Sequence, residues 1–421
     1  MLALLRRRDF ALLWTGGLIS IAGDWMLIVA LPIHVYRLTG STGATSLAVA
    51  METLPRLLLG SVAGVFVDRW DRRRVIVVAN LLLTLTLLVL VLPGATEHVA
   101  IVYGVAFTAA MLAQFVSPAE HALLPSLVDV ADVLAANALN GLNNNLARLL
   151  GPPLGGVIAA LWGLRGVGLL DALTFLAAAT LVAAIAATPR HRSMRDTAPA
   201  LVAGAGPWCA AWNEWRDGLG VVRRQATVTV VFGIVAVTSV GEGVFGVLLV
   251  VWIARVLDGG AAEYGWLMSA QAAGGLIGGA LTAAVARAMP LPWLLGLSAI
   301  AIGLVDLLIF NYPRIVPGIV PGLILFVVVG LPASWFFTTQ TTLLQQGVSD
   351  TYRGRVFGTL GTTGALMNVL GTLLAGLLGN RIGVVAVLNV QAVSYMTAGL
   401  AALLALQRLV PRSVRDTTPG F

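Results

Sequence analysis

Three acidic residues, Asp24, Glu52 and Glu242, interrupt long apolar stretches in which a charge is costly. A charged side chain at the centre of a lipid bilayer costs at least about 2.5 to 3.5 kcal/mol on insertion scales. A carboxyl group taken out of water favours its neutral form, so it can bind a proton on one side of a membrane and release it on the other. These residues are candidates for coupling proton movement to transport. A structural role is open for each, as a partner of a cation or as an acceptor of a buried hydrogen bond.

Two arginines, Arg56 and Arg148, lie in the same kind of apolar stretch. Arg56 follows Glu52 by four residues, which places both on one face of a helix and favours a fixed ion pair. Arg148 is a candidate partner for Asp24, and both arginines belong to the predicted proton-coupling set. Asp171 and Asp306 are weaker candidates because we expect them closer to the outer surface.

The elements that must carry these residues are membrane-spanning helices. Of the 421 residues, 58% are hydrophobic and 11% are charged, with a mean hydropathy of +0.91. Soluble domains have about 25% charged residues, and apolar runs without alternation disfavour a transmembrane β-barrel. The pattern predicts an all-α polytopic membrane protein with twelve spans in two six-helix bundles. The predicted spans are 10–35, 45–67, 75–93, 99–122, 138–161, 167–187, 225–253, 263–286, 292–310, 316–341, 357–379 and 384–407.

The positions of the arginines predict the orientation of these spans. All 26 basic residues are arginine, and 19 of them fall in the segments on the side of the N-terminus against 5 in the opposite loops. Basic residues concentrate in cytoplasmic loops, so both termini are expected in the cytoplasm.

Four segments follow from this layout. The predicted N-terminal bundle covers 1–187 and the C-terminal bundle covers 225–409, with a linker at 188–224 and a cytoplasmic tail at 410–421. In the linker, Trp208, Trp212 and Trp215 recur at helical spacing, which is typical of an amphipathic helix at the membrane interface. A helix packed beneath the bundle is the alternative interpretation.

Several functions are excluded or disfavoured by what the sequence contains. A phosphate-binding loop of the Gly-x-x-x-x-Gly-Lys type needs a lysine, and the chain has none, so transport driven by its own ATP site is disfavoured. One cysteine, Cys209, and four scattered histidines give no metal-ligand spacing. The net charge of +7 lies in loops and does not indicate nucleic-acid binding. We expect no enzyme activity, no cofactor and no metal.

The loop after the second span carries the pattern Gly-x-x-x-Asp-Arg-x-x-Arg-Arg, formed by Gly64, Asp68, Arg69, Arg72 and Arg73. It resembles the loop between the second and third helices of the major facilitator superfamily. Acid and arginine contacts there suit a latch that forms when the inner side closes and breaks when it opens. Alternatively, some of these arginines only fix the topology. The matching position in the second half, around Arg287, lacks the acid.

The fifth predicted span carries Gly151, Pro152, Gly155 and Gly156. Prolines bend a helix and glycines let a second helix approach closely. This pattern resembles the antiporter motif of exporters of the same superfamily. Together with Gly23-Asp24-Trp25 and the stretch 350–358, it resembles the 12-span drug:proton antiporter branch, which includes macrolide and multidrug efflux pumps and siderophore exporters. Span four lacks the arginine found there in many relatives, and Arg148 is a candidate for that role.

This resemblance implies a proton-coupled antiporter in the bacterial inner membrane that exports amphipathic small molecules by alternating access, among membrane lipids and as a monomer. The alternatives are a siderophore, lipid or metabolite transporter of the same fold, or a scaffold or receptor that transports nothing. An aromatic wall suits amphipathic cargo. The candidate substrate-binding residues on the spans that line the cavity of such carriers are Trp25, Phe115, Phe232, Phe245, Trp266, Trp335 and Phe336.

Overall fold

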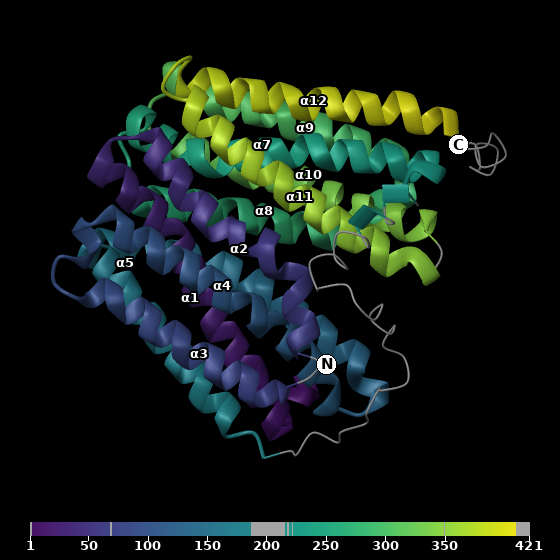
Figure 1. Cartoon of the computed structure of the whole chain (residues 1–421). Coiled ribbons are helices and arrows are strands. Elements are labelled where there is room, and N and C mark those ends of the chain that lie inside the picture. Colours follow the sequence, from purple (N-terminus) through teal and green to yellow (C-terminus); the bar gives the residue numbers. More distant parts are fainter. Residues whose placement is uncertain are drawn as a thin grey trace. The chain divides into compact units, whose positions relative to one another are not determined.

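The computed structural model describes residues 2–67, 70–186, 215–216, 219–220, 222–348 and 350–409. In this part of the chain, ten helices are long and apolar enough to cross a membrane by length and composition. The fold is all-α and polytopic, as the sequence predicts (Figure 1).

Each predicted span falls on a helix. The bounds are α1 Arg8–Thr39, α2 Thr42–Val67, α3 Arg72–Leu88, α4 Val99–Leu123, α5 Val133–Ala183, α7 Ala226–Val256, α8 Ala261–Ala288, α9 Leu291–Asn311, α10 Val320–Gly347, α11 Asp350–Leu378 and α12 Val384–Leu409. The long α5 contains two predicted spans, because Gly163 interrupts it with a non-helical, positive φ of 65°. Glycine adopts this backbone conformation without steric cost. With α5 counted as two helices, the described residues carry the twelve predicted spans.

The chain divides into two compact units. Unit 1 consists of residues 1–211 and 253–269, and unit 2 of residues 212–252 and 270–421. Unit 1 therefore includes the end of α7 and the start of α8. The domain boundaries expected from the sequence remain a prediction, and its linker tryptophans Trp208 and Trp212 lie outside the described residues.

In unit 1, α1 packs against α5, α3 against α5, and α2 against α4. Two antiporter-motif glycines of α5, Gly151 and Gly155, form the contact with α1, whereas Gly156 faces Ala261 of α8. A side chain at Gly151 would meet the backbone oxygen of Ala22 at 2.8 Å, and one at Gly155 would meet that of Met26 at 2.7 Å. Only glycine permits so close an approach, as expected for small residues at membrane helix interfaces. The segment of α1 from Ala22 to Met26 is thereby held in place.

The proline pair of α5 also receives a hydrogen-bond donor inside unit 1. Pro153 has no backbone N–H, so the carbonyl of Leu149 loses its usual helical donor. The hydroxyl of Ser269 donates a hydrogen bond to that carbonyl at 2.8 Å. A side-chain donor thus replaces the backbone donor that proline removes.

The end of unit 1 that carries the N-terminus is fixed by charged side chains. Asp71 caps α3 by accepting a hydrogen bond from the backbone N–H of Arg74 at 2.8 Å. Arg73 donates to the carbonyls of Val182 and Ala183 at the C-terminal end of α5, where a cation is favoured. The structure therefore gives Arg73 an anchoring contact. Arg72 is half-buried beside it. Gly64 lies on α2, whereas Asp68 and Arg69 lie outside the described residues.

Beside this anchor, Arg7 forms ion pairs with Asp129 at 2.6 Å and Asp132 at 3.0 Å. The hydrogen bond from Arg7 to Asp129 raises the pKa of the Arg7 guanidinium. These contacts join the start of α1 to the segment between α4 and α5.

In unit 2, α9 packs against α12 and α10. The indole of Trp252 on α7 is fully buried and lies edge-on to Phe310 on α9, with 6.1 Å between ring centroids. Trp215, the linker tryptophan that is described, donates its indole N–H to the hydroxyl of Thr363 on α11 at 3.3 Å. For this residue the contact favours packing against protein.

Candidate functional site

Asp24 lies on the part of α1 that the α5 glycines hold. Its neighbour Gly23 faces Asp171 and Thr174, and a side chain at Gly23 would collide with both of their oxygens. Asp171 is fully buried, and its Oδ1 accepts a hydrogen bond from the hydroxyl of Thr174 at 3.0 Å. The second oxygen of Asp171 has no hydrogen-bond partner. The absence of a side chain at Gly23 thus makes room for a second carboxyl group beside Asp24.

Four carboxyl groups gather in this region of unit 1, and each comes from a different helical segment. They are Asp24 on α1, Glu52 on α2, Glu120 on α4 and Asp171 on α5 after the Gly163 bend. Asp24 lies close enough for its negative charge to act on each of the other three. Like charges in an environment of low dielectric repel strongly, and a bound proton removes that repulsion. We call these four residues the acidic cluster.

The ion pair expected between Glu52 and Arg56 does not form. Oε1 of Glu52 is buried and has no hydrogen-bond partner, whereas the side chain of Arg56 is exposed. The two residues lie one turn apart on α2, but their side chains differ in environment. The Glu52 carboxylate is buried near Asp24, whereas the Arg56 side chain is exposed. The sequence interpretation of Glu52 as a permanently paired group is therefore wrong.

Arg148 and Trp25 form the second polar feature of unit 1. The Arg148 guanidinium lies over the Trp25 ring, with 5.7 Å from its central carbon to the ring centroid. Arg148 is exposed and Trp25 is half-buried. An arginine on an aromatic face is held there by a cation–π interaction.

Unit 2 contains the third predicted proton-coupling acid, Glu242 on α7. Its side chain is exposed, and its Oε1 accepts a hydrogen bond from the hydroxyl of the buried Tyr395 on α12. One turn earlier on α12, Gln391 donates to Oδ2 of the buried Asp306 on α9 at 3.2 Å. Each of these two acids therefore has a side-chain donor from α12.

The aromatic residues predicted to bind substrate occupy different settings. Phe232 and Phe336 are buried within unit 2, and the Trp335 indole donates to the backbone oxygen of Gly278 at 2.8 Å. Phe245 packs against Phe310, with 6.3 Å between centroids. The Trp266 side chain is exposed on the α8 segment of unit 1. Their roles remain predictions.

Phe115 lies in a groove of unit 1 with a volume of about 580 Å³. Residues of α3 and α4 line it, with Trp70 and Arg74 at one end. A groove of this size fits a small amphipathic molecule or part of a lipid chain. The structure thus places Phe115 next to α3, in a surface of mostly apolar side chains.

Two members of the acidic cluster, Glu120 and Asp171, are not in the proton-coupling set that the sequence predicts. The sequence places Asp171 closer to the outer surface, as a weaker candidate, and Glu120 near the expected end of span four. The available signal was the cost of any acid within a span, which applies to both. Only the packing of α4 and α5 against α1 brings them to Asp24.

The sequence matches the family described as "Transmembrane secretion effector" over residues 1–418. The chain belongs to this family of the major facilitator superfamily. Macrolide efflux protein A of Streptococcus pyogenes is 24% identical over 386 residues, which cover 89% of this chain and 90% of the relative. Multidrug efflux pump Tap of Mycobacterium tuberculosis is 29% identical over 399 residues, or 92% and 90% of the two chains. Enterobactin exporter EntS of Shigella boydii is 25% identical over 418 residues, or 97% and 94%.

Solved structures show the same fold. A mutant of nucleoside transporter NupG superposes with a TM-score of 0.75 at 10% identity and covers 94% of this chain and 99% of that one. A bacterial homologue of the iron transporter ferroportin gives a TM-score of 0.71 at 16% identity, with 95% and 98% covered. The expected family and fold are confirmed. The protein is a multi-pass membrane protein of a bacterial transporter family.

Proposed function

We propose that this chain is a proton-coupled antiporter that exports amphipathic small molecules by alternating access. The observation that carries the proposal is the acidic cluster, in which Asp24 lies among carboxyl groups from three other helical segments of unit 1. Four such groups inside apolar helices are costly to insert in a membrane, and this cost favours a functional role for their charge. Proton binding and release at Asp24 changes the local repulsion, and that change gives a transporter two states of different charge.

The relatives support the cargo class. A macrolide efflux protein, a multidrug efflux pump and an enterobactin exporter each align over most of this chain. Drugs and siderophores of these kinds combine apolar and polar parts. The orientation that we propose has both termini in the cytoplasm, since most arginines lie on that side, in the inner membrane of a bacterium.

Export of an anionic aromatic compound, such as a siderophore, is the second candidate. The Arg148 guanidinium over Trp25 favours it, because a cation beside an aromatic face suits a ligand with a negative group and a ring. The acidic cluster favours cationic cargo instead. The two candidates therefore predict opposite charge preferences.

Purified protein in liposomes tests the proposal. Vesicles that are acidic inside should take up a cationic dye or a macrolide faster than vesicles without a pH gradient, and a protonophore should remove the difference. Competition by a catecholate anion and by a cationic macrolide then distinguishes the two cargo classes. Uptake that ignores the gradient would overturn antiport, and the absence of flux for every amphipathic compound would favour a scaffold or receptor.

A further inference from the structure

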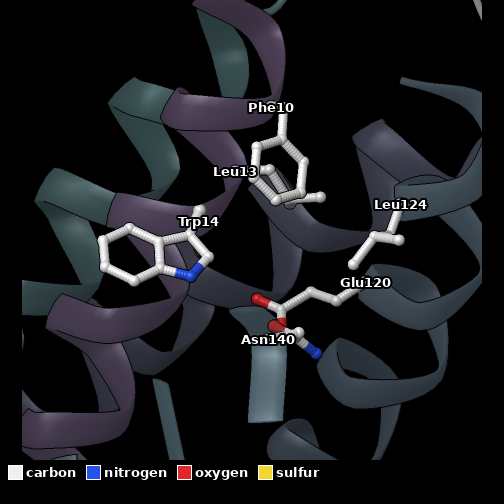
Figure 2. A pocket seen from close by; sticks show the side chains of 6 residues that line it. All are labelled: Phe10, Leu13, Trp14, Glu120, Leu124 and Asn140. Carbon is white, nitrogen blue, oxygen red and sulfur yellow. The ribbon is translucent and has the colours of Figure 1, made fainter. Parts of the chain in front are cut away.

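A small cavity lies in unit 1 between the start of α1, the end of α4 and the start of α5. It has a volume of about 10 Å³ and is lined by Phe10, Leu13, Trp14, Glu120, Leu124 and Asn140. That volume is close to the minimum that holds one water molecule. Figure 2 shows the carboxyl group of Glu120 turned toward Asn140 and the indole of Trp14. The polar wall of the cavity is thus one acid and one amide.

Two donors beside this cavity are occupied. The Trp14 indole donates to the backbone oxygen of Leu139, and the Asn143 amide donates to the backbone oxygen of Trp14, both at 2.9 Å. The carbonyl oxygen of the fully buried Asn143 has no hydrogen-bond partner. Asn143 and Glu120 approach the same point beside Gly17, within 3.6 Å and 3.7 Å of where a side chain there would begin. The Asn143 oxygen is thus a buried acceptor for which a water in the cavity, or a proton on Glu120, supplies a donor.

Glu120 also lies between the rest of the acidic cluster and the end of α1 that carries the N-terminus. Gly17, which Glu120 contacts, is seven residues before Asp24, or about 10 Å along the helix. Phe10, at the other side of the cavity, is two residues inside the start of α1. A proton that passes between Asp24 and the N-terminal side therefore meets Glu120 on the way.

The charged groups near Glu120 agree with this role. The helices packed against α4 carry Arg8, Asp9, Asp24, His34, Arg37, Glu52, Arg56, Arg72, Arg73 and Arg74. The helix α5, which lines the other side of the cavity, carries Arg148, Arg165 and Asp171. Of these, Asp24 acts on Glu120, and α5 presents the uncharged Asn140 and Asn143 to it. On α4 itself, the next residue, His121, is exposed. The charge of Glu120 is therefore sensitive to the protonation of Asp24.

We propose that Glu120 and this cavity form a water-mediated proton-exchange site between Asp24 and the N-terminal side of the membrane. The O–H bond of protonated Asp24 breaks, the proton passes through a bridging water, and a new O–H bond forms at Glu120. Glu120 then releases that proton to the water in the cavity and returns to the carboxylate. The inference deepens the proposed antiport function and rests on it.

The test uses the full-length protein in liposomes with Glu120→Gln, which keeps the shape and removes titration. We expect gradient-driven dye uptake to fall about tenfold, while exchange of labelled for unlabelled dye without a gradient stays within about twofold. Glu120→Asp keeps an acid and should restore part of the gradient-driven uptake. His121→Ala removes the adjacent exposed titratable group and should leave both rates and the pH profile unchanged.

Infrared difference spectra across a pH titration measure protonation of carboxyl groups directly. They distinguish proton exchange at Glu120 from a purely structural role of this residue. Wild type should show a protonated-carboxyl band that Glu120→Gln loses and Glu120→Asp keeps, and Asn140→Leu should slow proton exchange with Glu120 intact. Unchanged gradient-driven uptake in Glu120→Gln, or equal loss of uptake and exchange with no such band in wild type, would overturn the inference. A wild type without gradient-driven uptake would overturn antiport instead, and the infrared band would then decide whether Glu120 exchanges protons.

Discussion

The two units hold the acids of their helices in different ways. In unit 1, Glu52 and Asp171 each lie near Asp24, and one oxygen of each is buried without a hydrogen-bond partner. In unit 2, Glu242 accepts from the Tyr395 hydroxyl and Asp306 accepts from the Gln391 amide. In unit 1, Asp171 accepts a hydrogen bond from the Thr174 hydroxyl, and Asp24 acts on the other acids as a like charge. In unit 2, Glu242 and Asp306 also act on each other as like charges, but each accepts a hydrogen bond from a side chain of α12.

The difference separates two uses of a carboxyl group within a helix bundle. A donor from a packed helix fixes the position of an acid and joins two helices, as α12 does with α7 and α9. A carboxyl group beside other carboxyl groups, without a donor from a packed helix, breaks no interhelical hydrogen bond when its protonation changes. The change alters the local charge at little structural cost. We therefore expect transport to depend on unit 1 acids and stability to depend on unit 2 acids.

The largest effect is expected for Asp24→Asn. Removing the titratable group at the centre of the acidic cluster should lower the rate of pH-gradient-driven uptake about 100-fold. This corresponds to an increase of about 2.7 kcal/mol in the activation free energy. Exchange of labelled for unlabelled substrate without a gradient should persist, because the amide keeps the shape of the site. Equal loss of both rates would show that Asp24 acts through structure, and the contrast between the units would fail.

The next effect is expected for Gly23→Ala, which tests the room that unit 1 makes for two acids. The added methyl group meets the oxygens of Asp171 and Thr174, so the protein should lose about 1 to 3 kcal/mol of stability and most of its gradient-driven uptake. Gly104→Ala is the matched control, because no atom lies within 4 Å of the position a methyl group would take there. Thermal unfolding in detergent and the liposome assay measure both quantities. Equal behaviour of the two variants would argue against close packing at Gly23.

These positions also show which site residues could be predicted from the sequence. Charge cost within apolar runs identified Asp24 and Glu52, and the glycine and proline pattern of span five identified the face that packs on α1. Sequence spacing could not show which way the Glu52 side chain turns, because residues four apart on a helix have rotamer freedom that tertiary packing decides. The helix positions of Glu120 and Asp171 relative to Asp24 depend on contacts between segments more than 90 residues apart in the chain.

A smaller effect is expected for Glu242→Gln in unit 2. The glutamine carbonyl still accepts from the Tyr395 hydroxyl, so gradient-driven uptake should fall by about twofold to fivefold, far less than in Asp24→Asn. Tyr395→Phe removes the donor and should lower stability by about 1 kcal/mol with a similar small change in uptake. Loss of uptake in Glu242→Gln as deep as that in Asp24→Asn would reverse the assignment of transport to unit 1.

The smallest effect is expected for Ser269→Ala, which removes a hydroxyl donor from unit 1 away from its acids. The carbonyl of Leu149 would keep no donor, because Pro153 has no N–H to offer, so thermal unfolding should show a loss of about 1 kcal/mol. Uptake should stay within about twofold of wild type. Ser269→Thr keeps the hydroxyl and is the matched control. A large loss of coupling in Ser269→Ala, with Ser269→Thr unaffected, would mean that the proline segment of α5 controls the acidic cluster, since α5 holds α1 beside Asp24 through Gly151 and Gly155.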